Sequence, residues 1–131
     1  MEILFQKIAN ILNSMIPEDW DRVSLYAEVR EGFSQVFFYY YPIGSDKPIY
    51  SLDILDISSV DKRKHRELKH QLYEFFEELW NEFKVQEQEQ WTSLTYLLDI
   101  SGKMKVNYGY EDISLLSPVK KQEKWEAEYL R

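Results

Sequence analysis

The residues of this sequence most suited to chemistry are two histidines in a segment whose apolar residues recur at helical spacing. His65 and His70 lie five positions apart. Five residues rotate a helix by about 140° beyond one full turn, so the two imidazoles point apart and cannot bind one metal ion. Glu67 between them does not complete the His-Glu-x-x-His pattern of zinc proteases. We therefore expect both histidines in solvent, and no metal site.

Carboxylates near the ends of predicted strands are the second candidate group. They are Asp53, Asp56, Asp99, Glu111 and Asp112. A carboxyl group at a strand end can serve as a general acid or base. However, in a chain with 23 acidic residues, some carboxylates lie near one another without having any function. The sequence also has no Gly-x-Ser-x-Gly elbow, phosphate loop or dinucleotide fingerprint. We therefore expect no catalytic residue, no metal and no cofactor.

Composition limits the classes of protein to which the chain can belong. Its 131 residues suit one domain, residues 1–131, and the absence of Cys favours a reducing cytoplasm. The start of the chain lacks the basic region of a signal peptide, and no apolar run reaches the roughly 20 residues of a membrane span. A net charge of -7 disfavours direct binding of nucleic acid and favours a basic protein partner. Aromatic residues, at 16% of the chain, suit either a core or an interface.

The segment from Trp91 to Asp112 predicts a β-hairpin with a fixed register. With residues 100–102 as the loop and Gly102 in the left-handed conformation, Asp99 lies opposite Lys103. This register puts apolar and aromatic side chains on one face, and a slip by one residue would bury two lysines instead. We expect Tyr108 and Tyr110 in the core beside the other apolar residues of that face.

The rest of the chain predicts two helices and a three-stranded meander before the hairpin, and one helix after it. The expected elements are a helix ending before Pro17, strands over residues 22–30, 35–41 and 49–53, a helix over about 61–84 begun by Ser58 or Ser59, and a last helix from Ser117-Pro118 to Arg131. Helices segregated from an antiparallel sheet indicate an α+β fold.

The second strand leaves an alternative open. A two-residue loop after Arg30 points Val36, Phe38 and Tyr40 inward, whereas a three-residue loop would turn the intervening rings inward. In both cases we expect at least two rings on the outer face of the sheet. Trp91 and Trp125 are expected to be packing residues.

Several short motifs, in this order along the chain, resemble the YezG/EsaG family of bacterial antitoxins. They are Met15-Ile16-Pro17-Glu18-Asp19-Trp20, Tyr26-Ala27-Glu28-Val29, Phe38-Tyr39-Tyr40-Tyr41-Pro42, Lys47-Pro48-Ile49-Tyr50-Ser51, Leu79-Trp80-Asn81-Glu82-Phe83-Lys84 and residues 91–112. The resemblance implies an immunity protein that neutralises a nuclease toxin exported by the type VII secretion system, either by covering its active site or by holding it in an inactive shape.

The residues themselves suggest where such a partner binds. A nuclease cleft is basic because it attracts phosphate, so an acidic inhibitor with aromatic anchors matches it. We expect the interface to comprise Tyr39, Tyr41, Glu78, Trp80, Glu82, Glu111 and Asp112. The alternative is an acidic mimic of nucleic acid, or a general interaction domain, that binds another basic protein.

Overall fold

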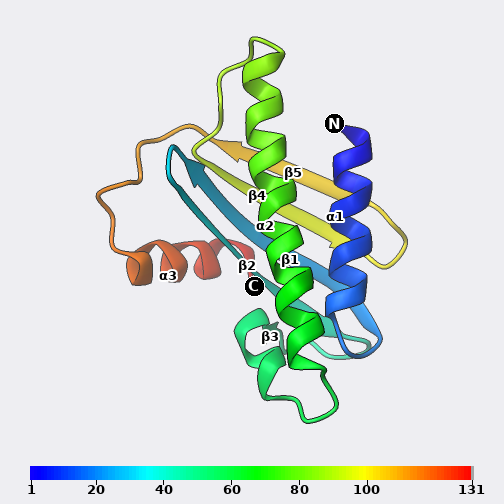
Figure 1. Cartoon of the computed structure of the whole chain (residues 1–131). Coiled ribbons are helices and arrows are strands. Elements are labelled where there is room, and N and C mark those ends of the chain that lie inside the picture. Colours follow the sequence, from blue (N-terminus) through cyan, green and yellow to red (C-terminus); the bar gives the residue numbers. More distant parts are fainter. Residues whose placement is uncertain (131) are drawn as a thin grey trace.

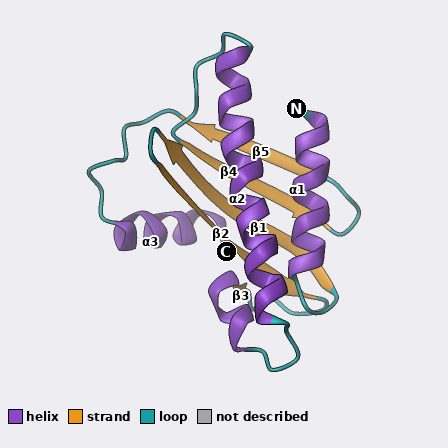
Figure 2. Cartoon of the chain, in the orientation of Figure 1, coloured by secondary structure: helices purple, strands orange, loops and turns teal. Residues whose placement is uncertain are grey.

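The computed structural model describes residues 1–130 and has the predicted α+β fold (Figures 1 and 2). Its elements are α1 (Glu2–Met15), β1 (Trp20–Arg30), β2 (Phe33–Pro42), β3 (Ile49–Tyr50), a short 3-10 helix (Ser51–Asp56), α2 (Lys62–Val85), β4 (Ser93–Asp99), β5 (Met104–Gly109) and α3 (Pro118–Tyr129). The expected end of the last helix at Arg131 lies outside the described residues. The predicted third strand is shorter than expected, because its second half forms the 3-10 helix.

All five strands form one antiparallel sheet in the order β3-β2-β1-β4-β5. The meander and the hairpin join because β4 pairs with the free edge of β1, with Leu25 opposite Tyr96 and Val23 opposite Leu98. β1 is therefore the central strand, and seven consecutive residues within it are buried. Burial of successive residues means that both faces of this strand are covered.

The first face of the sheet carries α1 and α2, which lie side by side in front of the strands (Figure 1). Their apolar stripes recur at intervals of three and four residues, as the sequence predicts, and pack on alternate residues of the strands. The fully buried side chains of this main core include Ile8, Leu12, Leu25, Phe76, Leu79, Trp91 and Tyr96.

The second face of the sheet is covered by α3, which lies behind the strands (Figure 1). Trp125 of α3 packs against Tyr26, Phe37 and Tyr39 in a separate aromatic cluster. The ring centroids of Phe37 and Trp125 are 5.4 Å apart in an edge-to-face arrangement, which aromatic pairs favour. The indole N–H of Trp125 also donates a hydrogen bond to Thr95 Oγ1 at 2.9 Å. The expected packing roles of Trp91 and Trp125 are both confirmed.

The connection between β1 and β2 is the two-residue loop, since Arg30 pairs with Phe33 across the turn. Val36, Phe38 and Tyr40 accordingly face the main core. Phe37 and Tyr39 lie on the other face of β2, as predicted, but this face is not exposed. Trp125 of α3 packs on both rings, because their apolar surface is removed from water there.

The register of the C-terminal hairpin is confirmed from Leu98 opposite Met104 back to Ser93 opposite Gly109. Gly102 has a positive φ of 92°, and the N–H of Asp99 donates to the carbonyl of Lys103 at 3.0 Å. Asp99 stabilises the loop further by accepting hydrogen bonds from the backbone N–H groups of Ser101 and Lys103. Tyr110, which follows the last strand, is 46% exposed, so its expected place in the core is wrong.

We expect Gly102→Ala to lower the free energy of unfolding by about 1–2 kcal/mol, because a Cβ atom disfavours positive φ by that amount. A Cβ atom added at Gly102 would meet no atom within 4 Å, so backbone strain alone accounts for the loss. Urea denaturation followed by circular dichroism measures the change. An unchanged unfolding midpoint would contradict the left-handed loop.

The ends of α2 and α3 follow capping rules, with one correction. Asp61 caps α2 by accepting hydrogen bonds from the N–H groups of Arg63 and Lys64, so the expected cap at Ser58 or Ser59 is wrong. The sequence favoured serine for this role, whereas aspartate is an equally good cap and directly precedes the helix. Ser117 caps α3 as predicted, with Pro118 at its first position.

Candidate functional site

Two of the seven predicted interface residues, Tyr39 and Tyr41, are buried. Tyr39 donates a hydrogen bond to Glu126 of α3 and accepts one from Gln122, and burial raises the pKa of its hydroxyl above the usual value. Tyr41 is 1% exposed, and the guanidinium of Arg22 lies 3.9 Å from its ring centroid. Neither ring is open to a partner while α3 and Arg22 are in place.

The predicted residues on α2 do not share one face of that helix. Glu78 and Glu82 each lie two positions from Trp80, and two residues rotate a helix by about 200°. Both carboxylates therefore point about 160° away from the indole. Trp80 is half-buried and turns towards the β1–β2 loop, whereas Glu78 lies on the solvent side of the helix. The two acids and the ring cannot form one contact patch.

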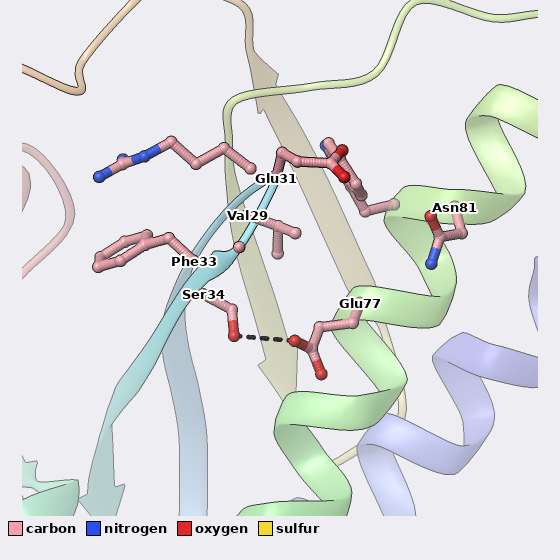
Figure 3. Close-up of a pocket in the computed structure, with 9 residues that line it drawn as sticks. Val29, Glu31, Phe33, Ser34, Glu77 and Asn81 are labelled. Atoms are coloured by element: carbon pink, nitrogen blue, oxygen red, sulfur yellow. Dashed lines mark hydrogen bonds between the residues drawn. The ribbon is translucent and has the colours of Figure 1, made fainter.

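Trp80 instead lies in a pocket between α2 and the β1–β2 loop, which we call the turn pocket (Figure 3). Its volume is about 330 Å³. The turn pocket is lined by Val29, Arg30, Glu31, Gly32, Phe33, Ser34, Glu77, Trp80 and Asn81. Glu77 lies three positions before Trp80, so both side chains are on the same side of α2. Aromatic and acidic side chains therefore meet here.

The charge of the turn pocket comes from Glu31 and Glu77, which are both exposed. Glu77 accepts a hydrogen bond from the hydroxyl of Ser34 at 3.1 Å, which joins α2 to β2 (Figure 3). The ring of Phe33 is 39% exposed, and the guanidinium of Arg30 lies 4.0 Å from its centroid. The Phe33 ring points away from Glu77 and α2 (Figure 3), so this cation–ring pair lies on the outer side of the turn and not between the carboxylates of the pocket.

Arg30 itself is held by a buried carboxylate. Glu28 is 2% exposed and accepts hydrogen bonds from Arg30, from the hydroxyl of Tyr26 at 2.9 Å and from the ammonium of Lys121 at 2.9 Å. Both oxygens of Glu28 are satisfied by these donors, as a buried charge requires. Lys121 belongs to α3. Through Glu28 and Arg30, α3 therefore helps to hold the β1 side of the turn pocket in place.

Glu111 and Asp112 lie at the same end of the molecule as the turn pocket. The indole N–H of Trp80 donates to the carbonyl of Trp91 at 3.0 Å, and the hydroxyl of Thr92 donates to the carbonyl of Glu111 at 2.6 Å. Hydrogen bonds from Ser114 lower the pKa of Asp112, and the charge of Arg30 lowers it further. Asp112 lines a small pocket next to the turn pocket together with Val29 and Arg30, whereas Glu111 lines neither of the two.

Sequence reasoning missed four residues that complete this site: Glu31, Phe33, Glu77 and Asn81. A signal for Glu77 and Asn81 was present, because Glu77 lies three positions before Trp80 and Asn81 four positions after Glu77, which are the spacings of neighbours on a helix surface. Glu31 and Phe33 flank Gly32 in a tight turn. In a two-residue turn, the side chains next to the turn lie at the end of the sheet and can contact another element that packs there.

The arrangement suits binding rather than a reaction. Asp99 accepts hydrogen bonds from the backbone of its own loop, and Asp112 accepts them from Ser114, so both carboxylates stabilise turns. Within residues 1–130, no three His, Asp or Glu side chains are placed to hold a metal ion. No helix in that part of the chain is long and apolar enough to cross a membrane.

His65 is buried, contrary to the expectation that both histidines lie in solvent. Its imidazole is 4% exposed, among Met15, Val36 and Leu72. Burial, reinforced by the nearby charge of Lys69, lowers the pKa of His65 below its usual value. His70 is exposed as expected and lies 3.0 Å from Glu74.

The buried histidine predicts a loss of stability as the pH falls below about 6.5. Below that value the unfolded chain protonates His65 while the folded protein keeps it neutral, so protons favour unfolding. We expect the free energy of unfolding to fall between about pH 6.5 and the lowered pKa. Urea titrations across this range measure the slope. His65→Gln should flatten it and His70→Gln should not; equal slopes in all three proteins would contradict the assignment.

Comparison with known proteins agrees with these observations. A family model described as "Immunity protein YezG-like" matches residues 1–131. Immunity protein YezG of Bacillus spizizenii is 40% identical over 110 residues, 84% of this chain and 68% of that protein. Immunity protein YezG of Bacillus subtilis is 38% identical over 113 residues, 86% of this chain and 75% of that protein.

A third relative comes from another genus. The type VII secretion system protein EsaG of Staphylococcus aureus is 35% identical over 109 residues, which make up 83% of this chain and 67% of that protein. The match of the family model covers the full sequence, and these relatives match most of it. The chain therefore belongs to the YezG-like immunity protein family and is an immunity protein, not an enzyme.

Proposed function

We propose that this protein binds and neutralises a nuclease toxin exported by a type VII secretion system, and that it does so in the cytoplasm. Its similarity to a type VII secretion system protein supports the route of export. The net charge of -7 supports a nuclease as the target, because a nuclease cleft must be cationic to attract phosphate. The absence of Cys favours the reducing cytoplasm.

The turn pocket carries this proposal, because it joins the two properties that an inhibitor of a basic cleft needs. The carboxylates of Glu31 and Glu77 attract cationic side chains, while the half-buried ring of Trp80 offers aromatic surface that can be desolvated. The Arg30 guanidinium beside Phe33 is an internal example of the contact that an arginine of the toxin would make. Exposed Glu111 and Asp112 extend the acidic surface from the pocket.

Glu78 and Glu82 have a different role in this proposal. They face away from the turn pocket, so they act through long-range attraction rather than through contact. Charges at the rim of an interface mainly change the rate of association, and that effect weakens as salt rises. Tyr39 and Tyr41 are left out of the contact surface because both are buried, and they contribute by packing β2.

Coexpression with the toxin encoded beside the gene for this protein tests the proposal. We expect the pair to copurify and the chain, added in equimolar amount, to abolish cleavage of DNA or RNA by the purified toxin domain. An acidic protein of similar size and unrelated fold controls for charge alone. Undiminished cleavage with the chain in excess, or a neighbouring toxin without nuclease activity, would contradict the proposal.

A further inference from the structure

A second hollow lies on the opposite side of the sheet from α1 and α2, between α3 and the β4–β5 hairpin. We call it the lysine groove. Its volume is about 600 Å³, nearly twice that of the turn pocket. The groove is lined by Tyr26, Ser93, Tyr108, Gly109, Tyr110, Glu111, Ile113, Leu116, Lys120, Lys121, Lys124, Trp125 and Glu128. Its chemistry differs from that of the turn pocket, because lysines rather than carboxylates line most of one wall.

The base of the lysine groove is aromatic and firmly held. Tyr26 and Trp125 meet edge to face with centroids 6.0 Å apart, and each has a buried hydrogen bond, to Glu28 and Thr95 respectively. The Tyr108 ring faces α2 and packs on Phe83 with centroids 5.2 Å apart, so Tyr108 is part of the wall at β5 and not of the aromatic base. A surface whose rings are already fixed loses little conformational entropy when a partner binds.

The positions of the groove lysines in α3 do not stabilise that helix. Lys120 lies in the first turn of α3 and Lys124 one turn later, and both are exposed. Like charges at this spacing cost about 0.2–0.5 kcal/mol, and cations near a helix N-terminus oppose the helix dipole. Lys121 is compensated by Glu28. Within residues 1–130, neither Lys120 nor Lys124 has an acidic group within ion-pair distance.

Exposed apolar side chains gather beside these lysines. Leu115 is 95% exposed, Val119 65%, Leu116 47% and Tyr110 46%, all within ten residues of the chain. Solvent-exposed apolar residues concentrated next to a groove mark an interaction site rather than a solvated loop. Unpaired cations beside an apolar surface require a ligand that offers both negative charge and an apolar group.

We propose that the lysine groove is a docking site for a segment of a protein partner that carries Asp or Glu side chains beside an aromatic or aliphatic anchor. The anchor would pack on Tyr110 and Leu116, and the carboxylates would pair with Lys120 and Lys124. Glu111 and Glu128 in the same groove repel the continuous charge of a nucleic acid, whereas a protein segment can place its few carboxylates at Lys120 and Lys124 and its apolar anchor elsewhere. This inference goes beyond neutralisation of a basic cleft, because its occupant has the opposite charge.

A short synthetic peptide of alternating Glu and Leu with one central Phe is the probe, titrated into the 15N-labelled full chain. We expect the indole N–H resonance of Trp125 to shift on binding. Lys120→Glu/Lys124→Glu should weaken binding about tenfold. The control Lys62→Glu/Lys64→Glu makes the same charge change at exposed residues at the start of α2 and should leave the affinity within about twofold.

Three outcomes would overturn the inference. In the first, the Trp125 resonance does not shift at saturating peptide. In the second, both charge-reversed pairs weaken binding equally, which would mean that the peptide responds only to net charge. A single-stranded oligothymidylate could also bind the groove more tightly than the peptide, which would assign it to nucleic acid. Thermal unfolding of each variant shows that the fold is retained, and the peptide with Lys in place of Glu serves as the matched negative probe.

Discussion

If the partner is the proposed nuclease toxin, the double substitution Glu31→Lys/Glu77→Lys is expected to weaken its binding about 100-fold, which corresponds to about 2.7 kcal/mol. Both carboxylates line the turn pocket, and reversing them places two cations against a cationic cleft. The loss should appear mainly as faster dissociation, because these charges are in contact in the complex. Surface plasmon resonance with the immobilised toxin domain measures both rates.

The control for this prediction is the pair on the opposite side of the helix. Glu78→Lys/Glu82→Lys changes the net charge by the same amount but acts on side chains that face away from the turn pocket. We expect slower association at low salt and an unchanged dissociation rate. If the outer pair speeds dissociation and the pocket pair does not, the toxin contacts the solvent side of α2 instead.

The second large effect is on stability. We expect Trp91→Ala to lower the free energy of unfolding by about 3–5 kcal/mol, because the ring is completely buried and its removal leaves a cavity between α2 and the sheet. The backbone carbonyl of Trp91, which alanine retains, accepts the hydrogen bond from Trp80, so the turn pocket is affected only if the backbone shifts into the cavity. Urea denaturation of the free protein measures the first effect.

Trp91→Phe separates packing from hydrogen bonding. The indole N–H of Trp91 is buried without a hydrogen-bond partner among residues 1–130, so phenylalanine removes an unsatisfied donor while it keeps most of the ring. We expect this variant to lose less than half as much stability as Trp91→Ala. Equal losses in the two variants would show that the ring contributes little to the core.

The elements with strong local signals were predictable from the sequence. The hairpin register follows from alternation and from Gly102, and α2 follows from a long stripe of apolar residues. His65 was misplaced although it precedes Leu68 by three positions and Leu72 by seven, which puts it on the same stripe. As a polar residue, His65 is expected in solvent, but its position on the apolar stripe of α2 buries it.

The pairing of β4 with β1 was not predictable, because no turn chemistry links strands so distant in the chain. The covering of the second sheet face by α3 had a signal that was not used. β2 carries rings at Phe37 and Tyr39 as well as at Phe38 and Tyr40, and such strands are buried on both faces. Without that inference, Tyr39 and Tyr41 were assigned to the surface.

Only part of the candidate site follows from the sequence. Trp80 and Asp112 lie near the same end of the sheet, and their place in an interface stays a prediction. The acidic second half of α2 favours Glu78 and Glu82, although helix geometry separates both from Trp80. Glu31 and Glu77 belong to the pocket through the packing of the β1–β2 loop on α2, which depends on the assembled fold.

Hydrogen–deuterium exchange of the chain with and without the proposed nuclease toxin is the most direct test of the central claim. The account predicts that the toxin slows exchange over residues 29–34 and 77–81, which form the turn pocket, and over 111–112 beside it. Exchange at the exposed start of α2 should be unchanged. Protection confined to α1 and the solvent side of α2, with the β1–β2 loop unaffected, would contradict the account.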